Sequence, residues 1–272
     1  MNLDPLIRIP RPPTRDPQRT TMLLGSILLS LLLSSEAAQA TDGIEPLGVS
    51  AKAQGRGGAD VAIGDTALSQ IDNPATLSLQ RHPAFDLSGE LLMCRMHWTS
   101  PAGESNSQGF HPLANLGVAM PVGDKFAWGV ALQSKAGMGS NYEMRHLMIP
   151  FMKRDVGCDL KNASLSLNAA YRLTDRLSLG VGGRFEIVTT KFNAVTGPVA
   201  MEFGRGYACG GGFNLGLHYQ ATDTLALGLS YRSPTWFGDL SGGDLTFSPL
   251  GLFPIHVGPV SMDDWSMAQK IN

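Results

Sequence analysis

The stretch KNASLSLNAAYRLTDRLSLGVGGRFEIVTT, residues 161–190, alternates between two kinds of side chain on both sides of a short turn. Alanine, leucine and tyrosine share one face of its first half, and mainly serine and asparagine share the other. The second half repeats the pattern after residues 174–176, with leucine, valine, phenylalanine and isoleucine on the apolar face. A period of two is typical of β-strands, whose successive side chains point to opposite faces. The stretch is therefore predicted to form a β-hairpin.

Two further hairpins with this pattern flank it, one turning at residues 122–125 and the other at residues 221–224. The connections between hairpins are longer, at roughly 99–111, 135–160, 192–204 and 233–259. Short turns at one end and long loops at the other are typical of outer-membrane β-barrels. Aromatic residues that would suit the girdles of such a barrel lie near strand ends on the apolar face, at Trp128, Tyr171, Tyr207, Tyr219 and Tyr231. We expect an all-β fold, a transmembrane antiparallel β-barrel of which about seven or eight strands are present.

A soluble β-sandwich is the alternative, because its strands also alternate between a buried and an exposed face. Sandwich strands usually run only about 5–6 residues, which is shorter than the alternating segments here. Arg184 and Glu186 fall on the inner face of their strand. Two charges would be costly in a sandwich core, whereas a water-filled barrel lumen would accommodate them. The barrel is therefore favoured.

The composition limits the possible functions. Charged residues make up 16% of the chain, hydrophobic residues 43%, and 32 residues are glycine. The formal net charge of -2 argues against nucleic acid as a partner, which would favour a basic surface. Cys94, Cys158 and Cys209 lack the C-x-x-C spacing of a zinc site and could form at most one disulfide. No serine-hydrolase motif is present. We expect no enzyme activity, no metal and no cofactor.

The N-terminus has the three parts of a secretory signal peptide. Four arginines precede an apolar run, MLLGSILLSLLL at residues 22–33, and a small-x-small cleavage pattern follows at Ala38-Gln39-Ala40. The run is too short for a comfortable bilayer span, which disfavours the alternative of an N-terminal anchor helix. Cleavage is predicted after Ala40, with export to an outer membrane of the Gram-negative type.

A glycine-rich segment follows, GRGGADVAIGDTALSQIDNPATL at residues 55–77. Gly55 and Gly57 match the first two glycines of a dinucleotide-binding loop, but Asp60 stands at the third position. No lysine follows these glycines at P-loop spacing. A carboxylate at the third position would repel a pyrophosphate. The glycines are better explained as backbone freedom in a compact folded plug.

Taken in order along the chain, these segments resemble the long-chain fatty acid transporter (FadL-like) family of outer-membrane proteins. The glycine-rich segment is similar to the N-terminal hatch of that family, which ends in an Asn-Pro-Ala element, here Asn73-Pro74-Ala75. Further similarity lies in PVGDKFAWGVALQSKAGMGS, SLNAAYRLTDRLSLGVG, LGLSYRSP and the final WSMAQKIN. The resemblance implies a signal peptide at residues 1–40, a hatch in the barrel lumen at 41–83 and a partial outer-membrane barrel at 84–272.

The resemblance also implies a function. The family takes up hydrophobic molecules, typically long-chain fatty acids, through an apolar pocket beside the hatch and a lateral opening made by a kinked third strand. The implied partners are a hydrophobic small-molecule ligand, outer-membrane lipid and the barrel-assembly machinery. Uptake of aromatic hydrocarbons and a structural or adhesive barrel are the alternatives. The family's barrel has about fourteen strands, and this chain ends without an aromatic residue, so we expect a C-terminally truncated member.

Three groups of candidate site residues follow from the resemblance. The hatch group is Gly55, Gly57, Gly58, Asp72, Asn73, Pro74 and Ala75. The lateral-opening group in the third strand is Gln133, Gly137 and Gly139, although these glycines would equally suit the start of an external loop. The ligand-capture group is Met144, Leu147, Ile149 and Phe151, whose adaptable apolar side chains would also suit packing within a loop.

Overall fold

The computed structural model describes residues 41–42, 45–100, 103–145, 153–196, 198–250, 252–263 and 266–272. Thr41–Asn272 form one compact unit. The predicted signal peptide lies outside the described residues. In the described part of the chain, no helix is both long enough and apolar enough to pass through a membrane.

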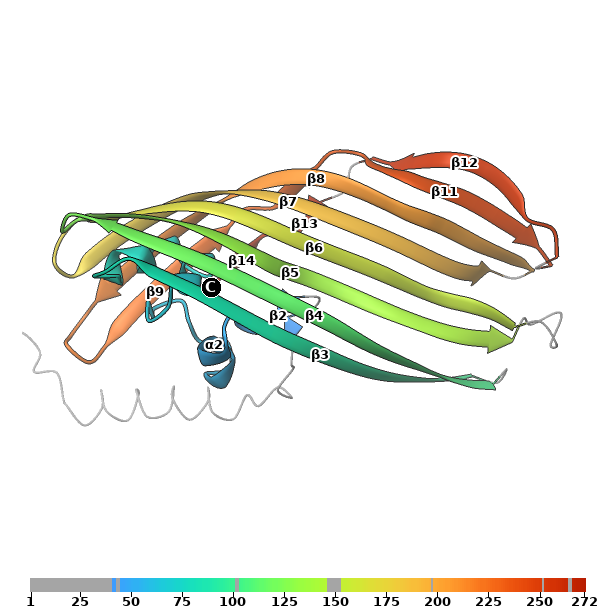
Figure 1. The fold of residues 1–272 in the computed structure, drawn as a ribbon, viewed down its shortest axis with the longest axis horizontal. Helices are drawn as coiled ribbons and strands as arrows, with labels where there is room; N and C mark the ends of the chain where they lie inside the picture. Colours follow the sequence, from blue (N-terminus) through green and yellow to red (C-terminus); the bar gives the residue numbers. More distant parts are fainter. Residues whose placement is uncertain are drawn as a thin grey trace, which may run out of the picture. The chain divides into compact units, whose positions relative to one another are not determined.

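One curved antiparallel β-sheet dominates this unit (Figure 1). Its longest strands follow one another in sequence, and each pairs with the next: β3 (Ala84–Ser100), β4 (Gly103–Val122), β5 (Phe126–Arg145), β6 (Lys153–Arg172), β7 (Leu177–Thr196) and β8 (Val199–Gln220). The alternating sequence favours this arrangement because the two faces of a pleated strand can meet different surroundings.

Beyond β8 the sheet continues in short pieces. Three of them lie in turn along β8, namely β9 (Ala226–Arg232), β10 (Thr235–Phe237) and β11 (Leu240–Pro249). Three more lie along these, namely β14 (Lys270–Ile271), β13 (Ser266–Met267) and β12 (Ile255–Met262). Pro234 separates β9 from β10, because proline cannot donate to a ladder. The pieces form two interrupted strands, so the sheet has eight strand positions within the described residues, as the sequence predicted.

The prediction of short turns is confirmed, and the prediction of long external loops is wrong. β4 passes to β5 through residues 123–125, β6 to β7 through 173–176, and β8 to β9 through 221–225. At the other end, strand structure continues through much of the segments 99–111, 135–160, 192–204 and 233–259 that were predicted as loops. The long strands are therefore about twice as long as the alternation suggested.

The outer ends of these strands escaped the sequence pattern because charged residues replace the apolar ones there. Asp159 of β6 lies 2.6 Å from Arg205 of β8 and 3.4 Å from Lys161. Lys191 of β7 lies 3.7 Å from Glu202 of β8. Where polar residues occupy both faces the alternation disappears, although the backbone ladder continues.

The outer face of the sheet is apolar along the middle of the strands. On β7, Val181, Phe185 and Ile187 are each about half exposed. Leaving such side chains in water would cost roughly 1.5–3 kcal/mol each, and contact with lipid avoids that cost. Tyr207 and Tyr219 lie on this face of β8, twelve residues apart. At about 3.4 Å per residue and a strand tilt of about 45°, they are about 29 Å apart along the membrane normal, close to the height of a barrel's apolar band.

The hatch lies against the inner face of the sheet (Figure 1). Its elements are β1 (Thr41–Asp42), β2 (Glu45–Pro46), α2 (Ala51–Gly55) and the 3-10 helices η1 (Ala67–Ile71) and η2 (Pro74–Leu79). Both 3-10 helices are buried. Leu77 packs with Ala119, Ala127 and Ala170 from β4, β5 and β6. The small inward residues of these strands therefore leave the space that the hatch fills.

Candidate functional site: the hatch seat and the β4–β5 seam

Asn73 is the centre of the contact between the hatch and the sheet. Its Oδ1 accepts a hydrogen bond from Ala75 N at 3.0 Å and so caps η2. Its Nδ2 donates to Val61 O within the hatch at 2.7 Å and to Leu217 O of β8 at 3.0 Å. Asn73 is completely buried, so losing these partners would leave polar atoms that water cannot reach. One side chain therefore ends a helix and ties the hatch to the sheet.

Two glycines of the sheet make room for the Asn-Pro-Ala element. A β-carbon on Gly216 of β8 would collide with Asn73 Oδ1 and would lie 2.9 Å from Pro74 Cδ. A β-carbon on Gly180 of β7 would collide with the backbone of Pro74 and Ala75. The element thus rests on a surface without side chains, where two backbones approach closely. We call Gly180 and Gly216 the hatch seat.

The remaining glycines of the hatch group shape one turn. Gly55 is the last residue of α2. Gly57 and Gly58 follow with φ angles of 67° and 84°, in the left-handed region that glycine enters without strain. These positions agree with the explanation of the glycine-rich segment as a folded plug.

Two carboxylates of the hatch, Asp65 and Asp72, have pKa values shifted in opposite directions. Arg56 is hydrogen-bonded to the buried Asp60 and lies 3.2 Å from Asp65. Partial burial would raise the pKa of Asp65, but the hydrogen bond and charge of Arg56 outweigh it and hold that pKa below its ordinary value. Burial raises the pKa of Asp72 to about 6, with the nearby charge of Asp60 adding to the effect and that of Arg232 opposing it.

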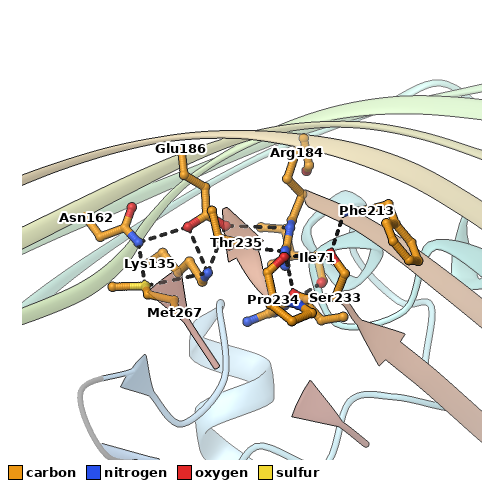
Figure 2. A network of polar contacts seen from close by, with 12 residues as sticks. Ile71, Lys135, Asn162, Arg184, Glu186, Phe213, Ser233, Pro234, Thr235 and Met267 are labelled. Atoms are coloured by element: carbon orange, nitrogen blue, oxygen red, sulfur yellow. Dashed lines mark hydrogen bonds and ion pairs between the residues drawn. The ribbon is translucent and has the colours of Figure 1, made fainter. Parts of the chain in front are cut away.

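A cluster of charged side chains covers the inner face of β5–β7 (Figure 2). Lys135 Nζ lies 2.8 Å from Glu186 Oε1, and Asn162 Nδ2 donates to Glu186 Oε2 at 3.0 Å. Arg184 Nε lies 3.5 Å from Glu186 Oε1, and Arg184 Nη2 donates to Ser233 O at 3.0 Å. The sequence placed Arg184 and Glu186 correctly on the inner face but expected water around them. They are instead buried, because Lys135 and the segment around β10 cover them (Figure 2).

Glu45 at the start of the hatch extends this cluster. Its Oε2 lies 2.9 Å from Arg232 Nη1 of β9 and 3.9 Å from Lys270 Nζ of β14, and its Oε1 lies 3.8 Å from Lys135 Nζ. Buried charges persist in proteins when they are paired in this way. The sequence analysis missed Glu45, Lys135 and Arg232, because their partners are distant in sequence. The isolated lysine in the otherwise uncharged run ALQSKAG was the one available signal.

Lys135 is also the extra residue of a β-bulge in β5. Ser134 pairs with Ala163 of β6 and Ala136 pairs with Asn162, so Lys135 has no residue opposite it. A bulge of this kind bends its strand and increases the local twist. The bend in β5 therefore occurs at the residue whose ammonium group reaches Glu186.

β4 and β5 separate next to this bulge. Their ladder runs from the Val122–Phe126 pair to the Asn115–Gln133 pair and continues no further in the described residues. On its other side β4 stays paired with β3 as far as Gly103. Figure 1 shows the outer ends of β3 and β4 apart from those of β5 and β6. We call the two facing edges beyond this ladder, residues 103–114 of β4 and 134–145 of β5, the seam.

The predicted lateral-opening residues lie at the seam. Gln133 is buried and is the last residue of β5 that pairs with β4, whereas Gly137 and Gly139 lie on the β5 edge of the seam. Both glycines remain paired with β6 and lie within β5, so they do not begin a loop. Their role in passage of a ligand stays a prediction.

The structure describes only one of the four predicted capture residues. Met144 lies in β5 opposite Arg154 of β6, and Leu147, Ile149 and Phe151 lie outside the described residues. Their role also stays a prediction.

A different apolar cluster occupies the inner face beyond the charged one, and the sequence analysis missed it. Val188, Phe203, Ala208 and Leu240 are buried together, and the rings of Phe192 and Phe203 stack with centroids 5.0 Å apart. Its members come from β7, β8 and β11, so only the strand pairing brings them together.

Comparison with known proteins gives the family. The sequence model described as Outer membrane protein transport protein (OMPP1/FadL/TodX) matches residues 31–243. The long-chain fatty acid transport protein of Escherichia coli (strain K12) is 28% identical over 149 residues, which cover 52% of this chain and 30% of that protein. Outer membrane protein P1 of Haemophilus influenzae is 31% identical over 144 residues, which cover 45% of this chain and 31% of that protein. The chain thus matches less than half of the length of these curated relatives.

Solved structures share the fold. The Ralstonia pickettii toluene transporter TbuX superposes with a TM-score of 0.72 at 21% identity, covering 83% of this chain and 66% of that one. The P. putida toluene transporter TodX gives a TM-score of 0.67 at 20% identity, covering 75% of this chain and 60% of that one. Two lines of evidence therefore point to the same family. One is the barrel sheet with a hatch on its inner face, and the other is the family match over most of the sequence. The chain belongs to the outer membrane protein transport family, OMPP1/FadL/TodX.

Proposed function

We propose that the chain serves the uptake of hydrophobic compounds, and of long-chain fatty acids in particular, across the outer membrane by binding and diffusion without chemical change. Long-chain fatty acids are favoured because several curated relatives carry the name of fatty acid transport proteins. The observation that carries the proposal is the end of the β4–β5 ladder beside the Lys135 bulge. A hatch fills the inner face of the sheet, so a ligand needs another way out, and the seam offers one.

The depth of the seam suits release into lipid. Trp128 faces outward near the short-turn end of β5, and Gln133 is five residues further along the strand. With the rise and tilt used above, the seam begins about 12 Å above Trp128 and runs toward the outer boundary of the apolar band. An acyl chain that leaves there is not exposed to water, and such exposure would cost about 0.8 kcal/mol per CH₂ group.

Labelled oleate tests the proposal. The full chain is expressed in cells that lack their own long-chain fatty acid uptake, and the initial rate of oleate entry is measured. We expect entry above that of the same cells without the chain. Entry at the background rate, with the protein present in the outer membrane, would exclude fatty acid uptake by this chain.

Uptake of aromatic hydrocarbons is the second candidate. The structures of similar fold named above are toluene transporters, and the stacked Phe192 and Phe203 rings offer an aromatic surface. Faster entry of labelled toluene than of oleate would favour this candidate. A structural or adhesive barrel is the third, and it predicts that neither compound changes the tryptophan fluorescence of the purified protein.

Export and assembly complete the proposal. Cleavage after Ala40 would give a mature protein that begins at Thr41, which N-terminal sequencing of the outer-membrane form would detect. Insertion would require outer-membrane lipid and the barrel-assembly machinery, so depletion of that machinery should leave the chain in the periplasm.

A further inference from the structure

Side chains, in place of a backbone ladder, connect the two edges of the seam. At its closed end, Ser134 Oγ accepts a hydrogen bond from Ala114 N at 3.2 Å and donates to Ala114 O at 3.1 Å. Ser134 N donates to Asn115 Oδ1 at 3.1 Å. Further out, Asn141 N donates to Ser107 Oγ at 2.9 Å. A few separate hydrogen bonds hold the two edges together, in contrast to the continuous β3–β4 and β5–β6 ladders.

Between these connections, the imidazole of His111 lies across the seam. An ideal β-carbon on Gly139 of β5 would lie 2.6 Å from His111 Cε1, and one on Gly109 of β4 would lie 2.5 Å from His111 Nε2. The ring therefore occupies space that two glycines, one on each edge, leave free. Its Nε2 is buried and has no hydrogen-bond partner among the described residues. Space filling, and not a polar contact at this atom, is thus what the ring contributes.

We propose that His111 is the specificity-determining residue of the lateral exit, and that its ring sets the largest ligand cross-section that passes between β4 and β5. This inference rests on the proposed function. Gly109 and Gly139, which meet the ring from the two edges, carry no side chain, so the ring supplies the bulk between them. Packed groups resist even one added methylene. A linear acyl chain therefore displaces the ring less than a methyl-branched chain of the same length does.

Two acids with the same head group and different widths test the inference. Cells that lack their own fatty acid uptake express the full chain or its His111→Ala variant, and the initial entry of labelled palmitate and of its methyl-branched analogue phytanate is measured. We expect the variant to raise phytanate entry relative to palmitate by about tenfold, the scale on which an apolar site distinguishes one methylene. His256→Ala is the matched control, because His256 is exposed on β12, far along the sheet order from the seam.

The outcomes separate the inference from the proposed function. An unchanged phytanate-to-palmitate ratio in His111→Ala overturns the inference, whether both rates rise together or neither changes. If the unmodified chain carries neither acid above background, the proposed function fails, and a second measurement decides whether His111 fills the seam.

That second measurement is thiol labelling at Gly139, the β5 position against which the ring lies. An ideal β-carbon there lies 2.6 Å from His111 Cε1, at the far end of a side chain and not against backbone, so Gly139→Cys should fold with the ring over its thiol. Purified protein in detergent is treated with a maleimide, and peptide mass spectrometry separates labelling at this position from labelling at the three native cysteines. Addition of His111→Ala should speed labelling at residue 139 several-fold and leave the native positions unchanged. Equal rates with and without the ring would show that His111 does not cover the seam.

Discussion

Lys135 Nζ and Glu186 Oε1 lie 2.8 Å apart with both side chains almost completely buried, and this contact joins the bulge of β5 to β7 across the intervening β6. Asn162 of β6 donates to the same carboxylate at 3.0 Å, so three adjacent strands meet at Glu186. The β4–β5 ladder ends two residues before Lys135 in sequence, at Gln133. The pair therefore fixes the bend in β5 at the point where the seam begins.

Removal of one partner of this pair should be strongly destabilising. Lys135→Met leaves the buried Glu186 carboxylate without its closest cation, and we expect a loss of about 3–5 kcal/mol in the free energy of unfolding. Urea unfolding of the detergent-solubilised protein, followed by tryptophan fluorescence, measures the loss. The double variant Lys135→Met/Glu186→Gln should recover part of it, since residue 186 then carries no charge, although Arg184 loses the carboxylate 3.5 Å from its Nε. A single variant as stable as the unmodified chain would show that the pair does not hold the bulge.

The hatch seat predicts that two glycines of one strand respond differently to the same change. Gly180→Ala places a methyl group against the backbone of Pro74 and Ala75, and should cost about 1–3 kcal/mol through overpacking. Gly183→Ala on the same strand has nothing within 4 Å of the added carbon and should have little effect. Limited proteolysis of the hatch in folded protein compares the two. Equal protection of the hatch in both variants would argue against the seat.

Asn73→Ala should loosen the hatch without unfolding the barrel. The variant removes the cap of η2 and the hydrogen bonds to Val61 O and Leu217 O. Each lost hydrogen bond should cost about 1 kcal/mol. We expect cells that express it to become more permeable to a large hydrophilic antibiotic. Asn106→Ala is the control, since Asn106 is exposed near the tip of β4 and its side chain is hydrogen-bonded to His97 of the neighbouring strand, away from the hatch. Unchanged permeability in Asn73→Ala would contradict the role of this residue.

Asp72 should make the hatch less stable at neutral pH than in mild acid. Its pKa is raised by burial from 3.8 to about 6, so the folded protein holds the proton more tightly than the unfolded chain does. Stability is then highest below pH 3.8, falls between pH 3.8 and 6, and is flat above. The fall is at most about 3 kcal/mol, from about 1.36 kcal/mol per pKa unit. Asp72→Asn should remove it, which thermal unfolding at pH 4 and pH 7 measures.

Asp65→Asn is the matched control for that measurement, because the sign of its effect is opposite. Arg56 holds the pKa of Asp65 below its ordinary value, so its contribution is present above that value and is lost as the pH falls through the lowered one. Asp65→Asn should therefore reduce stability at pH 7, where Asp72→Asn increases it. Two variants that respond alike would contradict this assignment of the two carboxylates.

Much of the fold could be predicted from local sequence. The alternation around Leu167 and Phe185 fixed which side chains face outward, and the short turns at residues 123–125 and 173–176 fixed which strands are neighbours. The pattern failed at the outer strand ends, where charged pairs such as Asp159–Arg205 replaced apolar residues. The backbone ladder needs no particular side chain, so it continued where the pattern stopped.

The sequence by itself determined the two faces of the strands, the order of the hairpins and the Asn-Pro-Ala element of the hatch, because each depends on residues close together in the chain. The tertiary structure decided the pairing of Lys135 with Glu186 and Glu45, the hatch seat, and the position of His111 over Gly139. These contacts depend on strand register, and one bulge at Lys135 shifts the register of every residue beyond it. The hydrophobic pattern of one strand does not predict that shift, since the register is set only when neighbouring strands pair.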